Sequence, residues 1–224
     1  MAYIAGFYIG DGKGAGHEPK VRFELADQEQ LQLVSRLVAQ ILRRKPKQCT
    51  RDGPFYVVDY DSVVLSEYLN RPVEWLVDQL KDFVGDFVQG FFDAEGYASC
   101  QINLRTKQIS SVVVGAANTR LEYLNLIERI LMNLGIHSAV RKTNKKGGNM
   151  TIRGRTWIRR QDVYQIVVHG FAAVDSFHKL VGFRNRTKAE KLRDLVNLRA
   201  IAPTERYAWF VAHYRKVKRR WIRI

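Results

Sequence analysis

The chain is poor in the features that define several classes of protein. Its 224 residues contain two cysteines, Cys49 and Cys100, which allow one bridge at most and exclude a disulfide framework or a thiolate metal site. Its apolar runs are only a few residues long, so we expect no membrane span. Residues Met1–Gly12 lack a positive n-region and a small-residue cleavage site, so we expect no secretory signal. A cytoplasmic protein is the simplest interpretation, associated with the nucleoid in a prokaryote, with an organelle as the alternative.

Acidic residues are scarce in only one part of the chain. The formal net charge is +15. Residues 1–90 hold 11 Lys and Arg against 13 Asp and Glu, whereas residues 91–224 hold 26 against 9. Such a one-sided surplus attracts polyanions, with nucleic acid as the first candidate and an acidic membrane surface as the second. A solvated basic face without a partner is the plain alternative. An apolar content of 46% is too high for a disordered chain.

A nine-residue segment occurs twice in the chain. Ile4–Gly12 reads IAGFYIGDG and Val88–Gly96 reads VQGFFDAEG. The two copies share a central Gly-Phe pair and the final glycine, and most other positions hold similar residues. An acid stands at the same register in both copies, as Asp11 and as Glu95. An internal repeat of this kind indicates two related structural units in one chain.

The segments that follow the two copies also correspond. Each copy continues into an alternating segment, a helical pattern, a further β-rich segment and a short helix. This order predicts an α+β fold of two αββαββα units, with a first half at residues 1–70, a linker at 71–85 and a second half at 86–224. The basic tail Tyr207–Ile224 is expected to form a helix. The corresponding segments are Val21–Leu25, Asp27–Leu42, Tyr56–Tyr60 and Ser62–Leu69 in the first half, and Ser111–Ala117, Asn118–Leu134, Tyr164–Val168 and Phe171–Phe177 in the second.

Small residues recur four positions apart within each copy. Gly6 and Gly10 in the first copy, and Gly90 and Ala94 in the second, would each share one face of a helix. Small residues at this spacing let two helix backbones approach closely. The repeat therefore predicts two helices packed side by side, with their ends at the same place.

Each predicted helix closes on an acid followed by glycine, the favoured helix terminator. Asp11 and Glu95 would then meet at neighbouring helix C-termini, where the helix dipoles and their mutual repulsion both oppose negative charge. A divalent cation with oxygen ligands would compensate, and Mg²⁺ or Mn²⁺ suits that ligand set. A lone Asp-Gly is usually only a turn, but two copies at one register favour a metal site.

The doubled segment resembles the two LAGLIDADG motifs of the homing endonucleases, in the form that carries both half-sites on one chain. The resemblance covers nearly the whole length, because the order of elements after each motif also fits. It implies two units packed through the motif helices about a pseudo-twofold axis, with antiparallel sheets that form a saddle on DNA. It also implies a monomeric, metal-dependent enzyme that makes a double-strand break with short 3′ overhangs in a long DNA target. Such enzymes are often encoded by mobile introns or inteins, and we expect an intron.

The resemblance assigns roles around the motif. Asp11 and Glu95 match the metal-binding acids, and Gly10 and Ala94 would offer backbone carbonyls to the metal. Asp93, inside the second motif, is interpreted as a residue that does not bind it.

The resemblance also implies supporting catalytic residues outside the motif. A polar residue is expected near the start of the helix after the second strand, and a basic residue near the last helix of each unit. In the first half these are Asp27 and, less well placed in the sequence, Arg71. In the second half they are Asn118 (or the neighbouring Ala116) with Arg186 and Lys188. The mismatch between the halves predicts two chemically unequal active sites.

Alternating strands predict a surface that faces DNA. In Ser99–Lys107 the outward positions are polar or basic and the intervening ones mostly apolar. Lys20–Leu25 and Thr151–Arg159 show the same alternation. The candidate DNA-binding residues are Lys13, Lys20, Arg22, Gln101, Asn103, Arg105, Lys107, Arg141, Lys142, Arg153, Arg155 and Arg159.

Two alternatives would use the same fold. An RNA maturase would bind intron RNA through the basic surface without cutting DNA, and a DNA-binding regulator would keep the fold and lose the chemistry. Retention of both acids favours cleavage of double-stranded DNA. No membrane partner is expected.

Overall fold

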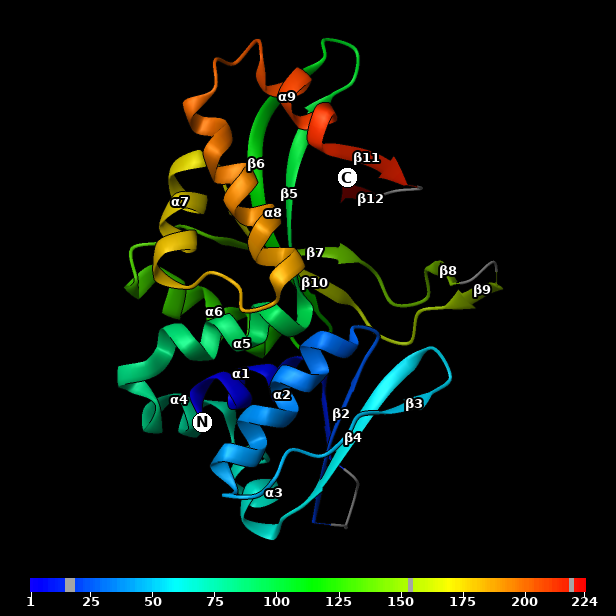
Figure 1. Cartoon of the computed structure of the whole chain (residues 1–224), viewed down its shortest axis with the longest axis vertical. Coiled ribbons are helices and arrows are strands. Elements are labelled where there is room, and N and C mark those ends of the chain that lie inside the picture. The colour runs from blue at the N-terminus through cyan, green and yellow to red at the C-terminus, as the bar shows by residue number, and fades with distance from the viewer. Residues whose placement is uncertain (15–18, 153–154, 218–219) are drawn as a thin grey trace. The chain divides into compact units, whose positions relative to one another are not determined.

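The repeat predicted from the sequence is present as two successive runs of helices and strands (Figure 1). The computed structural model describes the chain except for residues 15–18, 153–154 and 218–219. By their internal contacts the described residues divide into two units. Unit 1 comprises Met1–Glu95 and Arg120–Ile130, and unit 2 comprises Gly96–Thr119 and Leu131–Ile224. None of the described helices is long and apolar enough to cross a membrane.

Unit 1 contains a four-stranded antiparallel sheet of order β1-β2-β4-β3, with helix α2 packed against β2 and β4. Strand alternation turns Val21 and Phe23 into the core, where both are fully buried. Helix α2 begins where the side chain of Asp27 accepts a hydrogen bond from the backbone N–H of Gln30. The elements are α1 (Ala2–Asp11), β1 (Gly12–Gly14), β2 (Lys20–Leu25), α2 (Gln28–Ile41), β3 (Thr50–Asp52), β4 (Phe55–Asp61), α3 (Val63–Leu69), α4 (Val73–Gln79), the 3-10 helix η1 (Lys81–Phe83) and α5 (Val84–Glu95).

Unit 2 contains a four-stranded antiparallel sheet of order β5-β6-β10-β7. Val112, Val114, Ile166 and Val168 are buried on its inner face, and α7 and α8 pack against the sheet. Two further pairs of strands, β8–β9 and β11–β12, form small sheets of their own. The elements after α5 are β5 (Gly96–Asn103), β6 (Gln108–Asn118), α6 (Leu121–Asn133, shared between the units), β7 (Ala139–Asn144), β8 (Asn149–Ile152), β9 (Arg155–Ile158), β10 (Val163–His169), α7 (Phe171–Leu180), α8 (Arg186–Asn197), the 3-10 helix η2 (Leu198–Ala200), α9 (Arg206–His213), β11 (Tyr214–Val217) and β12 (Arg220–Arg223).

The predicted α+β class and the order αββαββα are confirmed. The first run is α1 to α3, and the second is α5, β5, β6, α6, β7, β10 and α7. The second run has an additional hairpin, β8–β9, between β7 and β10. Between the two runs, residues 71–85 contain α4 and η1, and α5 already begins at Val84.

The predicted helix over Tyr207–Ile224 is wrong beyond His213. Helix α9 ends there, and the chain continues as the antiparallel hairpin β11–β12. The physical reason lies in the side chains after His213. Tyr214, Val217, Trp221 and Ile222 are aromatic or β-branched, and such residues favour strands.

A buried polar chain crosses unit 1. The hydroxyl of Tyr3 in α1 donates to the carboxylate of Asp93 in α5 at 2.8 Å, and the side-chain amide of Gln30 in α2 donates to that hydroxyl at 2.6 Å. Asp93 is therefore engaged in the packing of three helices, and that it does not bind metal stays a prediction.

Replacing Tyr3 by phenylalanine tests this series of buried hydrogen bonds. Tyr3→Phe keeps the ring but removes the donor to Asp93 and the acceptor for Gln30, so we expect the free energy of unfolding to fall by about 1–3 kcal/mol. Urea unfolding followed by circular dichroism measures the change. Tyr68→Phe is the control, because no hydrogen bond of the Tyr68 hydroxyl is found among the described residues, and it should change stability by less than about 0.5 kcal/mol. If the two substitutions lowered the free energy of unfolding equally, the buried hydrogen bonds of Tyr3 would not stabilise the fold.

Both cysteines are free thiols, so the bridge that the sequence allowed is not formed. Desolvation by burial raises the pKa of the Cys100 thiol in β5 to about 12, although the charge of Lys191 opposes the shift. A raised pKa leaves little thiolate, roughly one part in 10⁴ at pH 8. We therefore expect iodoacetamide to label Cys100 far more slowly in the native protein than in guanidinium, which peptide mass mapping measures. Similar labelling rates in the native and the unfolded protein would contradict the burial of the Cys100 thiol.

Candidate functional site

The two motif helices, α1 and α5, lie against each other in unit 1 (Figure 1). A methyl group on Gly6 would overlap the backbone carbonyl of Phe87, and one on Gly90 would overlap the backbone carbonyl of Tyr3. Only glycine fits at these two crossing points, because each faces backbone rather than a flexible side chain. The close helix packing predicted from the repeated small residues is confirmed.

The acidic ends of the two helices come together. A methyl group on Gly10 would lie 2.6 Å from Cβ of Ala94 and 3.1 Å from Cγ of Glu95. Asp11 follows Gly10 as the last residue of α1, and Glu95 is the last residue of α5. Both acids are half-buried. Two carboxylates thus stand at neighbouring helix C-termini, where the helix dipoles oppose their charge.

Helix α1 ends at Asp11 with Gly12 as its C-cap, as predicted, but Gly12 does not take the left-handed conformation common at helix ends. Gly12 has a φ of −77° and a ψ of 148°, which is extended backbone open to any residue. A methyl group there would instead overlap the ring of Tyr8. Position 12 requires glycine because the ring of Tyr8 fills the space that a side chain would need.

The residues at the helix ends suit a hard divalent cation. Two carboxylates lie there, and the backbone carbonyls of Gly10 and Ala94 would add oxygen donors, which are what Mg²⁺ and Mn²⁺ take. Among the described residues no cluster of three or more His, Cys, Asp or Glu side chains is placed to hold a metal. A cation here would therefore draw its remaining ligands from backbone, water or a bound phosphate.

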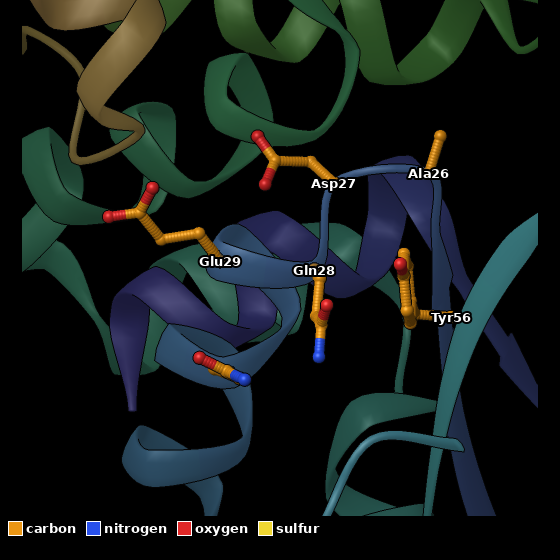
Figure 2. Close-up of a pocket in the computed structure, with 6 residues that line it drawn as sticks. Ala26, Asp27, Gln28, Glu29 and Tyr56 are labelled. Atoms are coloured by element: carbon orange, nitrogen blue, oxygen red, sulfur yellow. The ribbon is translucent and has the colours of Figure 1, made fainter. Parts of the chain in front are cut away.

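Asp27 lies in unit 1 at the start of α2. A pocket opens there, and Figure 2 shows the carboxylates of Asp27 and Glu29 on one side and Tyr56 on the other. The pocket is lined by Ala26, Asp27, Gln28, Glu29, Gln32 and Tyr56. Asp27 is exposed and its carboxylate already caps the helix, so its predicted catalytic role would have to be combined with a structural one.

The second-half counterparts lie in unit 2. Asn118 is the last residue of β6, opposite Tyr164 of β10, and Ala116 is fully buried two residues earlier. Asn118 therefore ends a strand and does not open the next helix, which begins at Leu121.

The basic candidates Arg186 and Lys188 lie in the first turn of α8. Arg186 is exposed and pairs with Glu190 at 3.1 Å. Lys188 is half-buried, and its ammonium lies 5.9 Å from the centre of the Phe183 ring. In unit 1, the guanidinium of Arg71 lies over the ring of Trp75.

The outward face of the first sheet is close to neutral. Lys20 and Arg22 stand on β2 as predicted, and the backbone of Lys13 on β1 pairs with that of Arg22. Arg22 is paired with Asp59 of β4 at 3.1 Å, and Lys20 lies opposite Asp61, which also pairs with Lys47 at 3.2 Å. Acids thus offset the basic residues on this face.

The outward face of the second sheet is polar and basic. Gln101 and Arg141 lie on it as predicted, and both are exposed. Three residues that were not predicted share the face. The hydroxyl of Tyr97 accepts a hydrogen bond from Gln165, whose carbonyl oxygen lies 3.3 Å from Arg141, and His169 lies 3.4 Å from Gln101. Alternation along β10, where Gln165 and His169 share one parity, was a signal that could have identified two of them.

The predicted strand Ser99–Lys107 is too long. Strand β5 ends at Asn103, because the carbonyl oxygen of the Asn103 side chain accepts hydrogen bonds from the N–H groups of Arg105 and Thr106 and bends the chain. Lys107 takes a positive φ of 51° in the same turn. Arg105 and Lys107 are exposed, but at the tip of a hairpin and not along a strand face.

The predicted strand Thr151–Arg159 is also wrong, since this segment is the hairpin β8–β9. Arg153 lies outside the described residues, and Arg155 is the first residue of β9. The guanidinium of Arg159 donates to the backbone oxygen of Asn149 at 3.0 Å. Lys142, on β7, is exposed and pairs with Asp162 at 2.6 Å.

Comparison with known proteins agrees with this architecture. Residues 82–182 match the model of the LAGLIDADG-like domain. An uncharacterised protein of Methanocaldococcus jannaschii is 27% identical over 205 residues, which are 88% of this chain and 71% of that protein.

Two solved structures share the fold. The LAGLIDADG homing endonuclease I-GzeII, in complex with its DNA target, aligns with a TM-score of 0.62 at 10% identity and covers 98% of this chain and 99% of its own. I-DmoI, in complex with DNA and Ca, aligns with a TM-score of 0.53 at 17% identity over 86% of this chain and 95% of its own. The chain therefore carries a LAGLIDADG-like domain at residues 82–182 and has the fold of the single-chain LAGLIDADG homing endonucleases.

Proposed function

We propose that this protein is a site-specific DNA endonuclease that makes a metal-dependent double-strand break with short 3′ overhangs. The observation that carries the proposal is the meeting of two acid-ended helices. Packing at Gly6 and Gly90 brings α1 and α5 into backbone contact, and Glu95 lies against Gly10, the neighbour of Asp11. The solved structures of the same fold include complexes with DNA, and one of them also contains Ca.

Asp11 and Glu95 would hold the divalent ions, with the carbonyls of Gly10 and Ala94 as further donors. A bound divalent ion supplies activation of water and stabilisation of the leaving oxygen in phosphodiester hydrolysis. Lys188 is the candidate for stabilising charge on the phosphate, because it stands half-buried in the first turn of α8, whereas the neighbouring Arg186 is already paired with Glu190. Asp27 and Asn118 would place polar groups near the reacting strands.

The two sheets would contact double-stranded DNA unequally. Gln101, Arg141 and Gln165 offer the second sheet donors and acceptors for base edges and phosphates. On the first sheet, Asp59 and Asp61 offset Arg22 and Lys20, so phosphate attraction is weaker there. We expect most of the electrostatic affinity to come from unit 2.

We propose that the protein acts as a monomer, because both acid-ended helices stand on one chain, and that it is intron-encoded. A cytoplasmic location, near the nucleoid in a prokaryote, would give it access to DNA.

Cleavage of a plasmid library of randomised targets tests the function. We expect cutting with Mg²⁺ and none with EDTA, and sequencing of the ends should show one long, roughly bipartite site with short 3′ overhangs. Tight, sequence-selective DNA binding without cutting would overturn the nuclease and favour a regulator. Low DNA affinity in a folded protein, together with binding to intron RNA, would favour a maturase.

A further inference from the structure

The chain continues for about 40 residues after the second αββαββα unit is complete, and this segment is very basic. Residues 184–224 contain 13 Lys and Arg and only 3 acids, Glu190, Asp194 and Glu205. The segment thus holds a net charge of +10 out of the +15 of the whole chain. It forms α8, η2, α9 and the hairpin β11–β12.

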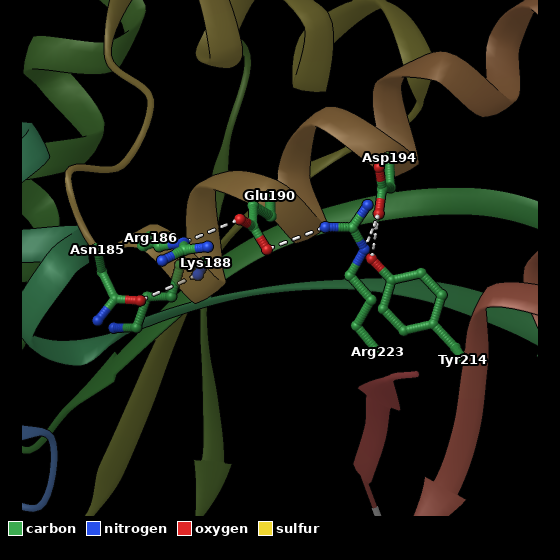
Figure 3. A network of polar contacts seen from close by, with 7 residues as sticks. All are labelled: Asn185, Arg186, Lys188, Glu190, Asp194, Tyr214 and Arg223. Atoms are coloured by element: carbon green, nitrogen blue, oxygen red, sulfur yellow. Dashed lines mark hydrogen bonds and ion pairs between the residues drawn. The ribbon is translucent and has the colours of Figure 1, made fainter.

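The C-terminal hairpin is fixed to α8 by a network of polar contacts (Figure 3). Arg223 of β12 bridges two acids of α8, with 3.0 Å to Glu190 and 3.2 Å to Asp194. The hydroxyl of Tyr214 donates to the same oxygen of Asp194 at 2.7 Å, and both residues are buried. Lys191 donates to the backbone oxygen of Trp221 at 3.1 Å. The hairpin is therefore held in one place and is not a loose basic tail.

The network also removes negative charge from the segment. Glu190 receives hydrogen bonds from Arg186 and Arg223, which lower the pKa of its carboxyl and keep it ionised and paired at neutral pH. Asp194 is paired with Arg223. Two of the three acids in the segment are thus already paired with its own cations.

The hairpin presents cations to solvent. Arg215 and Lys216 of β11 are exposed, and neither pairs with an acid in the part of the chain that the structure describes. Strand pairing sets Arg215 opposite Ile222, with Val217 two residues along on the same side; both aliphatic side chains are partly exposed. A two-stranded ribbon with such a face can lie along a nucleic-acid backbone or groove, where cations contact phosphate and aliphatic groups contact sugar or thymine methyl.

We propose that residues 184–224 form a phosphate-contacting clamp, in which Arg215 and Lys216 bind the backbone of the same duplex DNA that the two sheets engage. The inference rests on the proposed DNA binding and extends it beyond the two sheets. Phosphate contacts carry little sequence information. The clamp therefore adds affinity on every sequence and makes no choice of target.

Salt dependence of binding tests the clamp. Each phosphate contact adds about 1 to the slope of log Kd against log salt concentration, so Arg215→Gln/Lys216→Gln should lower the slope by about 2, on target and random duplexes alike. Fluorescence anisotropy of labelled duplexes measures it. Arg36→Gln/Lys81→Gln is the matched control, since it removes the same charge from two exposed residues on helical elements of unit 1. The control should leave the slope unchanged.

Several outcomes would overturn the clamp. One is a slope that falls equally in both double variants, and another is a slope that falls in neither. Unchanged DNA binding by the clamp variant, with loss of binding to phosphatidylserine vesicles, would assign the segment to a membrane surface instead. A wild-type protein that binds no duplex at all would defeat the proposed function itself. If the wild-type protein cut DNA and the clamp variant had the same salt dependence of DNA binding as the wild type, only this inference would be defeated.

Discussion

Asp11→Asn and Glu95→Gln should each abolish cleavage of at least one DNA strand while DNA binding is retained. Each substitution keeps the shape of the side chain and removes the charge that would hold a divalent ion. Loss of one charge-stabilising group in an active site costs about 10²-fold or more in rate. Single-turnover cleavage of a duplex labelled differently on its two strands measures the loss strand by strand.

Asp82→Asn is the control for these variants. It makes the same change of charge at an exposed acid in the same unit, on η1, which leads into the N-terminal end of α5, whereas Glu95 is at the C-terminal end of that helix. We expect it to cut both strands at the wild-type rate. If the double variant Asp11→Asn/Glu95→Gln cut both strands at that rate, the two acids would not be the catalytic ones.

Gly90→Ala should be among the most destabilising single substitutions in the chain. In a helix, alanine is favoured over glycine by about 1 kcal/mol, so propensity alone predicts a gain in stability. The added methyl group would instead overlap the backbone carbonyl of Tyr3, and Gly6→Ala would meet the carbonyl of Phe87 in the same way. Since backbone cannot rotate away, α1 and α5 would have to separate, at a cost of at least about 3 kcal/mol.

Thermal and urea unfolding of both variants measure this cost. Gly148→Ala is the control, because a methyl group there would approach the carbonyl of Lys145 only to 3.2 Å, against 2.0 Å from the carbonyl of Tyr3 at Gly90, and it lies in a partly exposed turn where a small shift relieves the contact. It should change stability by less than about 1 kcal/mol. A Gly90→Ala protein as stable as wild type would contradict the close packing of the motif helices, and with it the position of Asp11 and Glu95.

The sequence predicted the parts of the fold that are periodic or repeated. The two motifs identified the paired helices, their glycines and the register of Asp11 and Glu95, because a repeat carries its own alignment. Alternation in Lys20–Leu25 correctly separated the buried Val21 and Phe23 from outward positions. These features depend on local spacing alone.

What the sequence did not predict depends on single side chains or on distant partners. Alternation continues through Lys107, but Asn103 captures two backbone N–H groups and ends the strand. The buried hydrogen bonds from Gln30 through Tyr3 to Asp93 join residues far apart in the sequence, so no local sequence pattern predicts them. The C-terminal hairpin depends on Arg223 reaching back to Glu190 and Asp194 on α8.

The central claim is that a divalent cation is bound where α1 and α5 end. Anomalous X-ray diffraction from crystals grown with the cleaved DNA site and Mn²⁺ tests it most directly, because anomalous density locates the ion without reference to the protein. The account predicts a peak within coordination distance of a carboxylate oxygen of Asp11 or Glu95, lost in the double variant Asp11→Asn/Glu95→Gln. Mn²⁺ bound elsewhere in an active complex, with both carboxylates out of reach, would contradict it.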